Sequence, residues 1–591
     1  MAFSKRKAIA YAGLILSLTW LVFYLKQVDL TLIYYWQQTV PLPIAEYMLV
    51  PGGLSNFLAI RFNEWLIFPI RGTVAVIAVL AVTYWLLRSI FNHYKEGPFY
   101  HPLLLASMVP LVLALASYRL PMGLISGFVT GLVISVIQPL YTPGNPAVKL
   151  VYTFITGMIT YLLAGPVGLF VFLQITLCKI LRKGDYAGLY AAVLPLLTIP
   201  FLYLFFNQAV TVKQSLLGTL IISKYDEIPL TFFICLFVPT VLMVIYWGIS
   251  KLFSKTAQKR VLLAEGMGTA VVLGGLIFSS LFAIDSEERS ILQIEQASFN
   301  DDWQRVRALA DEDLYHNQLV QFEINRALYH QGVLLEEAFR YPQTFGEEGI
   351  FMVQVFSGRN GMHVSDFYAD LGFANESRHW ANESHMVMMR HPILLKQLIL
   401  SYLAMDMQDL ALKYLGVLSG STVHRAWCEQ TLESFEEKDL DGIPYLKAFK
   451  DNNPADDFFA SPSNPVQGLQ YFYTVNPGNR AAFEFLMTSY MLKHQLGPVI
   501  GHIKDFKKFG YSHLPRAIEE AVMIYLDKTH FRFIDLDGYP ISQNTVEEFK
   551  DFSRLVTNSK SRSEARSRVS KYRKTYWYYV MYSSPYAPES K

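Results

Sequence analysis

The chain has 591 residues, of which 52% are hydrophobic, 15% aromatic and only 17% charged. A soluble globular protein carries roughly 25% charged residues, so this composition excludes a disordered chain and an ordinary cytosolic enzyme. The net charge of +2 hides two unlike halves. Residues 1–284 contain 19 Lys and Arg against 8 Asp and Glu, whereas residues 285–591 contain 32 against 41. We therefore predict a membrane domain over 1–284 and a soluble domain over 285–591.

Nine apolar segments of the first half approach the length that crosses a bilayer, whose hydrocarbon core of about 30 Å takes about 20 helical residues. Only Ala164–Pro166 separates the fifth and sixth segments, which predicts a tight hairpin. Pro195 and Pro200 predict a kink in the seventh. The predicted spans cover residues 8–25, 70–91, 101–118, 121–140, 150–164, 166–182, 187–206, 229–250 and 266–284.

The Lys and Arg residues between the spans predict their orientation, because cytoplasmic loops carry an excess of both. With the N-terminus inside, the inner segments contain thirteen and the outer loops six. The basic cluster Lys251–Arg260 decides the orientation beside the last span. Nine crossings then place residues 285–591 outside the cytoplasm.

The first outer loop, residues 27–69, is rich in aromatic residues and has two interpretations. It is typical of an interfacial or re-entrant helix that begins after Pro51–Gly53. It also contains Asp29, Glu46 and Glu64. Polytopic glycosyltransferases that use lipid-linked sugar donors place a catalytic or metal-binding carboxylate in this loop, where it acts as a general base or holds a cation. These three residues are therefore the candidate catalytic residues.

Ionisable residues are nearly absent from the predicted spans. Arg88 and Lys179 lie near span ends, where their side chains can reach the interface. A proton-coupled or ion-coupled transporter keeps carboxylates or histidines at mid-membrane. A transporter or flippase therefore ranks third among the functions considered.

Residues 285–591 show helical periodicity and a 34-residue repeat, the period of tetratricopeptide helix pairs. Tyr368 and Tyr402 stand 34 residues apart, as do Ser377 and Ala411. The predicted fold is all-α: a bundle of about nine spans followed by a tetratricopeptide-like α-solenoid. Three aromatic residues of the two best repeats are candidate binding residues that fit core positions equally well: Tyr368, Trp380 and Tyr402.

No motif indicates a metal or a cofactor. Three cysteines are too few for a disulfide framework. His379, His385 and His391 recur every six residues, a spacing that spreads them around a helix instead of on one face. We expect no metal, no cofactor and no nucleic acid partner. The basic and aromatic tail after Ser559 predicts a capping or membrane-facing helix.

The chain resembles an uncharacterised family of bacterial polytopic inner-membrane proteins with a C-terminal tetratricopeptide-like domain. The resemblance covers nearly the whole length and rests on short motifs: Pro51–Leu54 with Phe68, Pro69 and Gly72, Arg340–Gln343, Ser365–Tyr368 through Trp380 and Ala381, and Tyr576 with Trp577. It implies a multi-pass inner-membrane protein and brings no established activity or catalytic residues.

The sequence supports two main functions and does not decide whether the protein is an enzyme. The first is an envelope protein that displays an extracytoplasmic helical-repeat domain to a protein or peptide partner, with membrane lipids around its spans. The alternative is a membrane glycosyltransferase with a lipid-linked sugar donor, which rests on fold-level analogy. A cavity open to the outer leaflet with a carboxylate at its rim would favour the enzyme; a filled bundle would favour an anchor.

Overall fold

A computed structural model describes most of the chain, and the residues it describes contain helices and no strands. The predicted spans 121–140, 187–206 and 229–250 and the basic cluster Lys251–Arg260 extend partly outside these residues. The described residues are 2–48, 50–92, 97–138, 144–183, 189–207, 211–212, 215, 230–252, 258–352, 357–437, 443, 446–454, 464–529 and 534–587.

The chain divides into two compact units. Unit 1 comprises Met1–Arg289 together with the short segment Gly420–Val423, and unit 2 comprises Ser290–Ser419 and His424–Lys591.

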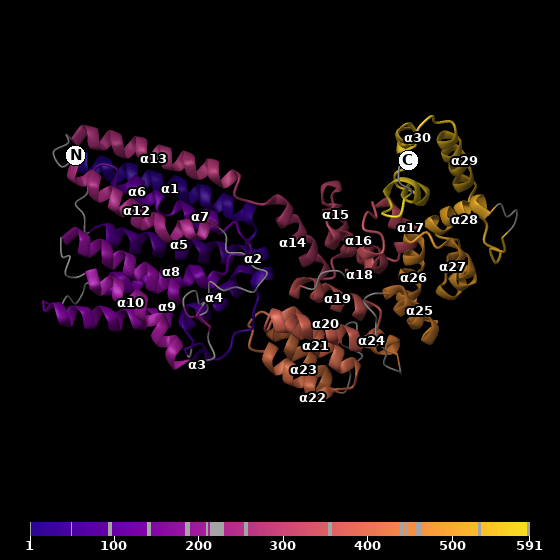
Figure 1. Cartoon of the computed structure of the whole chain (residues 1–591), viewed down its shortest axis with the longest axis horizontal. Helices are drawn as coiled ribbons and strands as arrows, with labels where there is room; N and C mark the ends of the chain where they lie inside the picture. Colours follow the sequence, from indigo (N-terminus) through magenta and orange to yellow (C-terminus); the bar gives the residue numbers. More distant parts are fainter. Residues whose placement is uncertain are drawn as a thin grey trace. The chain divides into compact units, whose positions relative to one another are not determined.

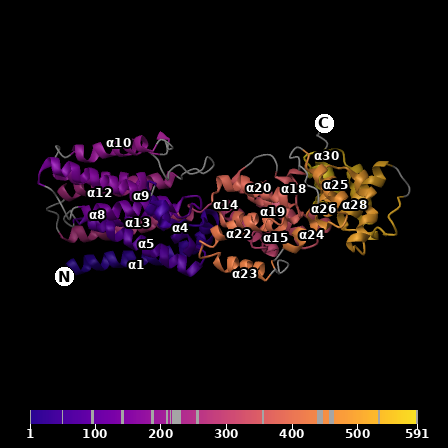
Figure 2. The same ribbon diagram turned by 90° about the horizontal axis from the view of Figure 1, so that it is seen from below.

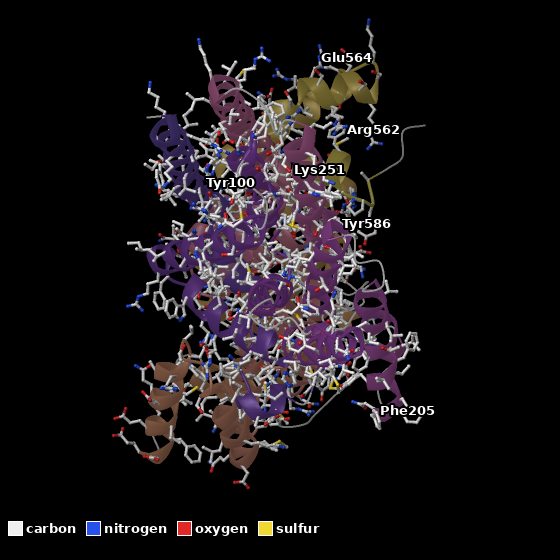
Figure 3. All side chains as sticks on the ribbon, turned by 90° about the vertical axis from the view of Figure 1, so that its left-hand side faces the viewer. Tyr100, Phe205, Lys251, Arg562, Glu564 and Tyr586 are labelled. Carbon is white, nitrogen blue, oxygen red and sulfur yellow. The ribbon has the colours of Figure 1, made fainter. Side chains whose placement is uncertain are left out.

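Unit 1 is a bundle of apolar helices whose long members run alongside one another (Figures 1 and 2). α1 packs against α13, α8 against α9, and α12 against α6, α7 and α9. Many large apolar side chains face outward, including Ile70, Phe205 and Phe206, and Phe205 projects from the bundle in Figure 3. The helices are α1 (Ala2–Val28), α2 (Leu30–Gln37), α3 (Ile44–Tyr47), α4 (Gly53–Leu66), α5 (Pro69–Phe91), α6 (Tyr100–Ala106), α7 (Val109–Ala114), α8 (Met122–Ile137), α9 (Pro146–Lys183), α10 (Leu189–Phe206), α12 (Leu230–Leu252) and α13 (Gln258–Leu281).

Five helices of the described residues are long and apolar enough to cross a membrane, fewer than the nine predicted: Lys5–Val28, Pro69–Phe91, Ala147–Ile180, Phe232–Leu252 and Lys259–Leu281. Three predicted spans instead correspond to shorter apolar helices, Tyr100–Ala114, Met122–Ile137 and Val193–Phe206. The first of these is broken between Ala106 and Val109, one residue before Pro110, because proline cannot donate the helical hydrogen bond. The other two predicted spans lie within α9.

α9 reverses its direction at Gly165, where the backbone is non-helical (φ 72°, ψ −171°). The hydroxyl of Tyr152 donates to Gln138 O (3.3 Å) and Lys179 Nζ donates to Ser135 O (2.8 Å), so both arms reach the same end of α8. A straight helix would hold Tyr152 and Lys179 about 40 Å apart. The two arms therefore fold back on each other at Gly165.

The turn at Gly165 is closed by the loop that precedes α4. Gly52 N donates to Leu162 O (2.9 Å) and Tyr161 O (3.2 Å), and Ser55 Oγ donates to Leu163 O (3.1 Å). These carbonyls lose their helical partners where Gly165 and Pro166 interrupt the helix, and a buried carbonyl without a donor is costly. α4 itself packs against α5, α8 and α9, so the first loop inserts into the bundle.

Unit 2 is built from short helices, and many neighbours in sequence pack against each other: α19 on α20, α20 on α21, α21 on α22, and α25 to α29 in turn. Ala411 is buried, as expected for a small residue where helices cross. The α-helices are α14 (Ser286–Ser298), which begins in unit 1, α15 (Trp303–Leu309), α16 (Gln318–His330), α17 (Leu334–Glu337), α18 (Glu348–Phe351), α19 (Gly358–Asp370), α20 (Ala374–Val387), α21 (Pro392–Ala404), α22 (Gln408–Leu418), α23 (Arg425–Glu436), α24 (Leu446–Asn452), α25 (Pro465–Val475), α26 (Arg480–Leu492), α27 (Leu496–Gly501), α28 (Arg516–Thr529), α29 (Gln543–Thr557), α30 (Arg562–Arg568) and α31 (Tyr576–Tyr578). Shorter turns are η4 (Glu312–Leu314), η5 (Ala338–Arg340), η7 (Ile503–Phe509), η8 (Ser570–Tyr572) and η9 (Tyr579–Ser583).

We predict that Gly52→Ala destabilises unit 1 by about 1–3 kcal/mol, because Gly52 has φ +77° and an added Cβ would lie 3.2 Å from Gly165 Cα. Thermal unfolding of the purified chain in detergent, followed by near-UV circular dichroism, measures the loss. Gly248→Ala is the matched control, since a Cβ there meets open space within α12. Equal melting temperatures for both variants would contradict the role of Gly52.

Candidate functional site

Unit 2 contains a network of charged side chains inside its helix packing, which we call the ionic cluster. It joins α14, α16 and α19, and Glu295, Glu323, Arg326 and His363 are fully or almost fully buried within it. Its members are Glu295, Glu323, Arg326, Arg359, His363 and Asp370.

Helical spacing explains why these residues meet. Glu323 and Arg326 are three residues apart on α16, and Arg359, His363 and Asp370 recur on α19 at intervals of four and seven, so each set shares one face of its helix. Both helices begin with a side-chain cap. Asn317 Oδ1 accepts from Leu319 N (3.0 Å), and Ser357 Oγ accepts from Asn360 N (3.0 Å).

His363 lies between two carboxylates. Its Nδ1 is 2.6 Å from Glu323 Oε1 and its Nε2 is 3.4 Å from Glu295 Oε1, with no side-chain surface exposed. Burial alone would lower the pKa of this imidazole, but the two facing carboxylates outweigh burial and raise the pKa to about 9. His363 is therefore a buried cation at neutral pH.

The two arginines supply the remaining positive charge. Arg359 Nε donates to Glu295 (2.6 Å), and Arg326 Nε donates to Asp370 (2.8 Å) while its guanidinium lies 5.3 Å from the ring centre of Trp303. Burial opposes the charge on Glu295 and Asp370, yet the neighbouring arginines hold the pKa of each carboxyl at about 2. Each buried charge thus faces an opposite one, as a low-dielectric interior requires.

The ionic cluster cannot act on a substrate in this arrangement. General acid–base catalysis needs a group within hydrogen-bond reach of a bound substrate. His363 has no exposed surface and its two ring nitrogens face Glu295 and Glu323. The cluster therefore fixes the mutual placement of α14, α16 and α19.

The three candidate catalytic carboxylates occupy different environments in unit 1. Asp29 is half-buried at the end of α1 and accepts from Thr31 Oγ1 (2.7 Å), whereas Glu46 on α3 is exposed. Glu64 on α4 is buried. Its Oε1 accepts from Ser421 Oγ (2.9 Å) and Thr422 N (3.0 Å), and its Oε2 accepts from Thr422 Oγ1 (2.8 Å) and Arg61 Nη1 (3.0 Å). Within the described ranges no group of three or more His, Cys, Asp and Glu side chains is placed to hold a metal ion.

The three candidate binding residues lie among packed helices. Tyr402 is buried and its ring stacks on Tyr414 with centroids 5.6 Å apart. Tyr368 and Trp380 are half-buried and pack against the main hydrophobic core of unit 2. Only Tyr368 and Trp380 thus keep part of their surface available to a ligand.

Unit 1 contains a small apolar cleft between α5, α8, α9 and α12, whose volume of about 10 Å³ is close to the room that one water molecule needs. Its two polar lining residues bond to each other, because Thr240 Oγ1 donates to Gln174 Oε1 (2.9 Å). No acidic side chain lines this cleft. This uncharged cleft is too small for a sugar phosphate.

Sequence reasoning missed the ionic cluster. The sequence drew attention to His379, His385 and His391 as possible metal ligands. The histidine that is buried among charged side chains is His363. The sequence does contain a pattern that indicates the cluster. The charged residues of α19 recur with helical spacing on the face of the helix that also carries its apolar residues. Charges at core positions indicate either a buried network or a wrong helix assignment, and only coordinates separate the two.

The fold and these sites define a protein whose described residues form helices, with one apolar unit and one unit built around buried ion pairs. The chain belongs to a family of unknown function, DUF6057, which matches residues 5–583. No curated protein and no solved structure gives a significant match.

We predict that unit 2 loses stability as the pH rises through about 9. The folded pKa of His363 lies above its usual value of 6.5, so its contribution is complete below pH 6.5 and disappears as the folded imidazole deprotonates. The shift corresponds to about 3 kcal/mol. Urea unfolding of the full chain in detergent between pH 7 and 10 measures it. His363→Gln should be less stable at pH 7 and should lack the loss between pH 7 and about 9. A loss of the same size in His363→Gln would contradict the assignment.

Proposed function

We propose that this protein is a multi-pass membrane protein that displays unit 2 on the side of the membrane opposite its N-terminus, where unit 2 binds a protein or peptide partner. A bacterial cell envelope is the setting that the resemblance implies. The outward apolar side chains of unit 1 support the membrane placement, since soluble proteins rarely expose such extensive apolar surface.

Hydrogen bonds near the helix ends support the predicted alternation of sides along the chain, because they join segments that are predicted on the same side. On the outer side, Gln37 Nε2 donates to Tyr118 O (2.7 Å), and Tyr118 Oη donates to Val28 O (2.8 Å). On the inner side, Arg6 Nη2 donates to Glu265 (2.9 Å) and to Gly97 O (2.5 Å).

The reversal at Gly165 supports an odd number of crossings. Both arms of α9 return to the same side, so this helix contributes either two crossings or none. If the shorter apolar helices α6–α7, α8 and α10 cross once each, as α1, α5, α12 and α13 do in this proposal, the total is odd. An odd total supports the proposal that unit 2 lies on the side opposite the N-terminus.

Exposed apolar side chains on consecutive helices of unit 2 carry the proposal of partner binding. Met386 and Met389 expose 75% and 67% of their surface beside the turn between α20 and α21. Four more large apolar side chains are exposed on or just before α22 and on α23: Met407, Leu410, Val417 and Leu432. Flexible methionines suit a surface that adapts to a peptide, and tetratricopeptide-like helix pairs offer such surfaces.

No observation favours glycosyl transfer as a second function. That function needs a carboxylate that faces a cavity for the donor. The cleft of unit 1 has no acidic lining, and both carboxylate oxygens of Glu64 already accept two hydrogen bonds each.

Site-specific photo-crosslinking in the native cell tests the partner. A photoreactive amino acid at Met386, Met389 or Leu410 should give one and the same protein adduct, because these positions lie on the proposed surface. The matched control is Lys528, which is exposed on α28. Met389→Asp should reduce the adduct at Met386 at least about fivefold, since a charge on an apolar contact costs about 1 kcal/mol or more. Adducts of equal yield at Lys528, or lipid adducts alone, would contradict the proposal.

A further inference from the structure

A second surface of unit 2 is strongly cationic. Residues 560–574, which include α30 and η8, contain seven Lys and Arg and one acidic residue, Glu564. Arg562 and Glu564 mark α30 in Figure 3, where side chains of this helix project outward. The exposed cations of this basic segment are Lys560, Arg566, Arg568, Lys571, Arg573 and Lys574.

Neighbouring groups account for only part of this charge. Lys571 pairs with Asp551 (2.7 Å), Arg568 approaches Glu564 (3.6 Å), and Arg562 donates to Met581 O (2.5 Å). Among the described residues, the side chains of four exposed cations have no carboxylate partner: Lys560, Arg566, Arg573 and Lys574. This unpaired charge is available to a ligand.

The residues that follow hold the basic segment in place. Tyr576 and Trp577 are buried in the main core of unit 2. Tyr576 N donates to Glu520 (2.5 Å), Tyr576 Oη donates to Met491 O (2.8 Å), and Tyr579 Oη donates to Leu492 O (3.0 Å). The cations are therefore presented on a fixed frame, which lowers the entropy cost of binding.

Burial of the aromatic residues also bears on the kind of partner. A segment that rests on a bilayer inserts apolar side chains between the headgroups. Here the aromatic run faces the protein core, so the basic segment offers charge without apolar side chains to insert. The guanidinium groups of Arg566 and Arg573 present paired donors that match carboxylates.

We propose that the basic segment binds an acidic segment of a partner protein. The proposal rests on the proposed function, protein binding by unit 2, and names the chemistry of one partner. It uses α30 and η8, not the apolar side chains of α20–α23, so the two surfaces can be tested separately.

The test is fluorescence anisotropy of a fluorescein-labelled decaglutamate peptide with the full chain in a neutral detergent. The variant Arg566→Glu/Arg573→Glu/Lys574→Glu should bind at least about tenfold more weakly, because attraction becomes repulsion at three positions. The control Lys413→Glu/Lys447→Glu/Lys528→Glu makes the same change in net charge at exposed cations elsewhere on unit 2. It should change the dissociation constant less than about twofold, and salt should weaken wild-type binding.

Three outcomes would overturn the proposal. The first is no binding of the peptide by the wild-type chain at low salt, and the second is equal weakening of binding in both triple variants. The third is displacement of the labelled peptide by phosphatidylglycerol nanodiscs but not by unlabelled decaglutamate, which would assign the surface to lipid. Failure here leaves crosslinking from Met386 and Met389 intact. Failure of the proposed function would remove those crosslinks without changing the response of the basic segment to decaglutamate.

Discussion

The hydrogen bonds from Gly52 and Ser55 to the carbonyls before Gly165 are the interaction on which unit 1 depends. An apolar bundle offers no water to backbone groups freed from a helix, so a chain can turn inside it only where other protein groups supply donors. Gly52 and Ser55 supply these donors. The absence of a side chain at Gly52 and at Gly165 lets the two backbones approach each other. This contact joins the reversal of α9 to the insertion of α4, and the proposed topology of the crossings depends on it.

Unit 2 meets a different constraint. Its helices are short, and a short helix is only marginally stable without tertiary contacts. The core of unit 2 also contains charged residues. Ion pairs in a buried site contribute less than hydrophobic packing of the same volume, but they penalise every arrangement that separates them. The ionic cluster thus makes one placement of α14, α16 and α19 much better than the others. A rigid frame of this kind suits the proposed role of unit 2 in presenting a surface to a partner.

The sequence predicted the helical class and the position of most apolar helices, because period and hydropathy are local properties. The motif at Ala164–Pro166 pointed to the reversal in α9. The count of full-length spans was too high, since length alone does not show that α6 breaks before Pro110 or that α8 is short. Local sequence patterns could not predict the contacts between segments that are distant in the sequence. The sequence around Glu64 does not predict that Ser421 and Thr422 donate hydrogen bonds to its carboxylate. The sequence around His363 likewise does not predict its contacts with Glu295 and Glu323.

The most direct test of this account is the side of the membrane on which the C-terminus lies. If α9 were one straight span, the apolar helices would cross eight times and unit 2 would share the side of the N-terminus. In the proposed topology, the reversal at Gly165 makes this number odd. Alkaline phosphatase, which is active only outside the cytoplasm, and green fluorescent protein, which fluoresces there poorly after export, can each be fused after Lys591. We predict an active phosphatase and a dark fluorescent fusion; a bright fluorescent fusion with inactive phosphatase would contradict the account.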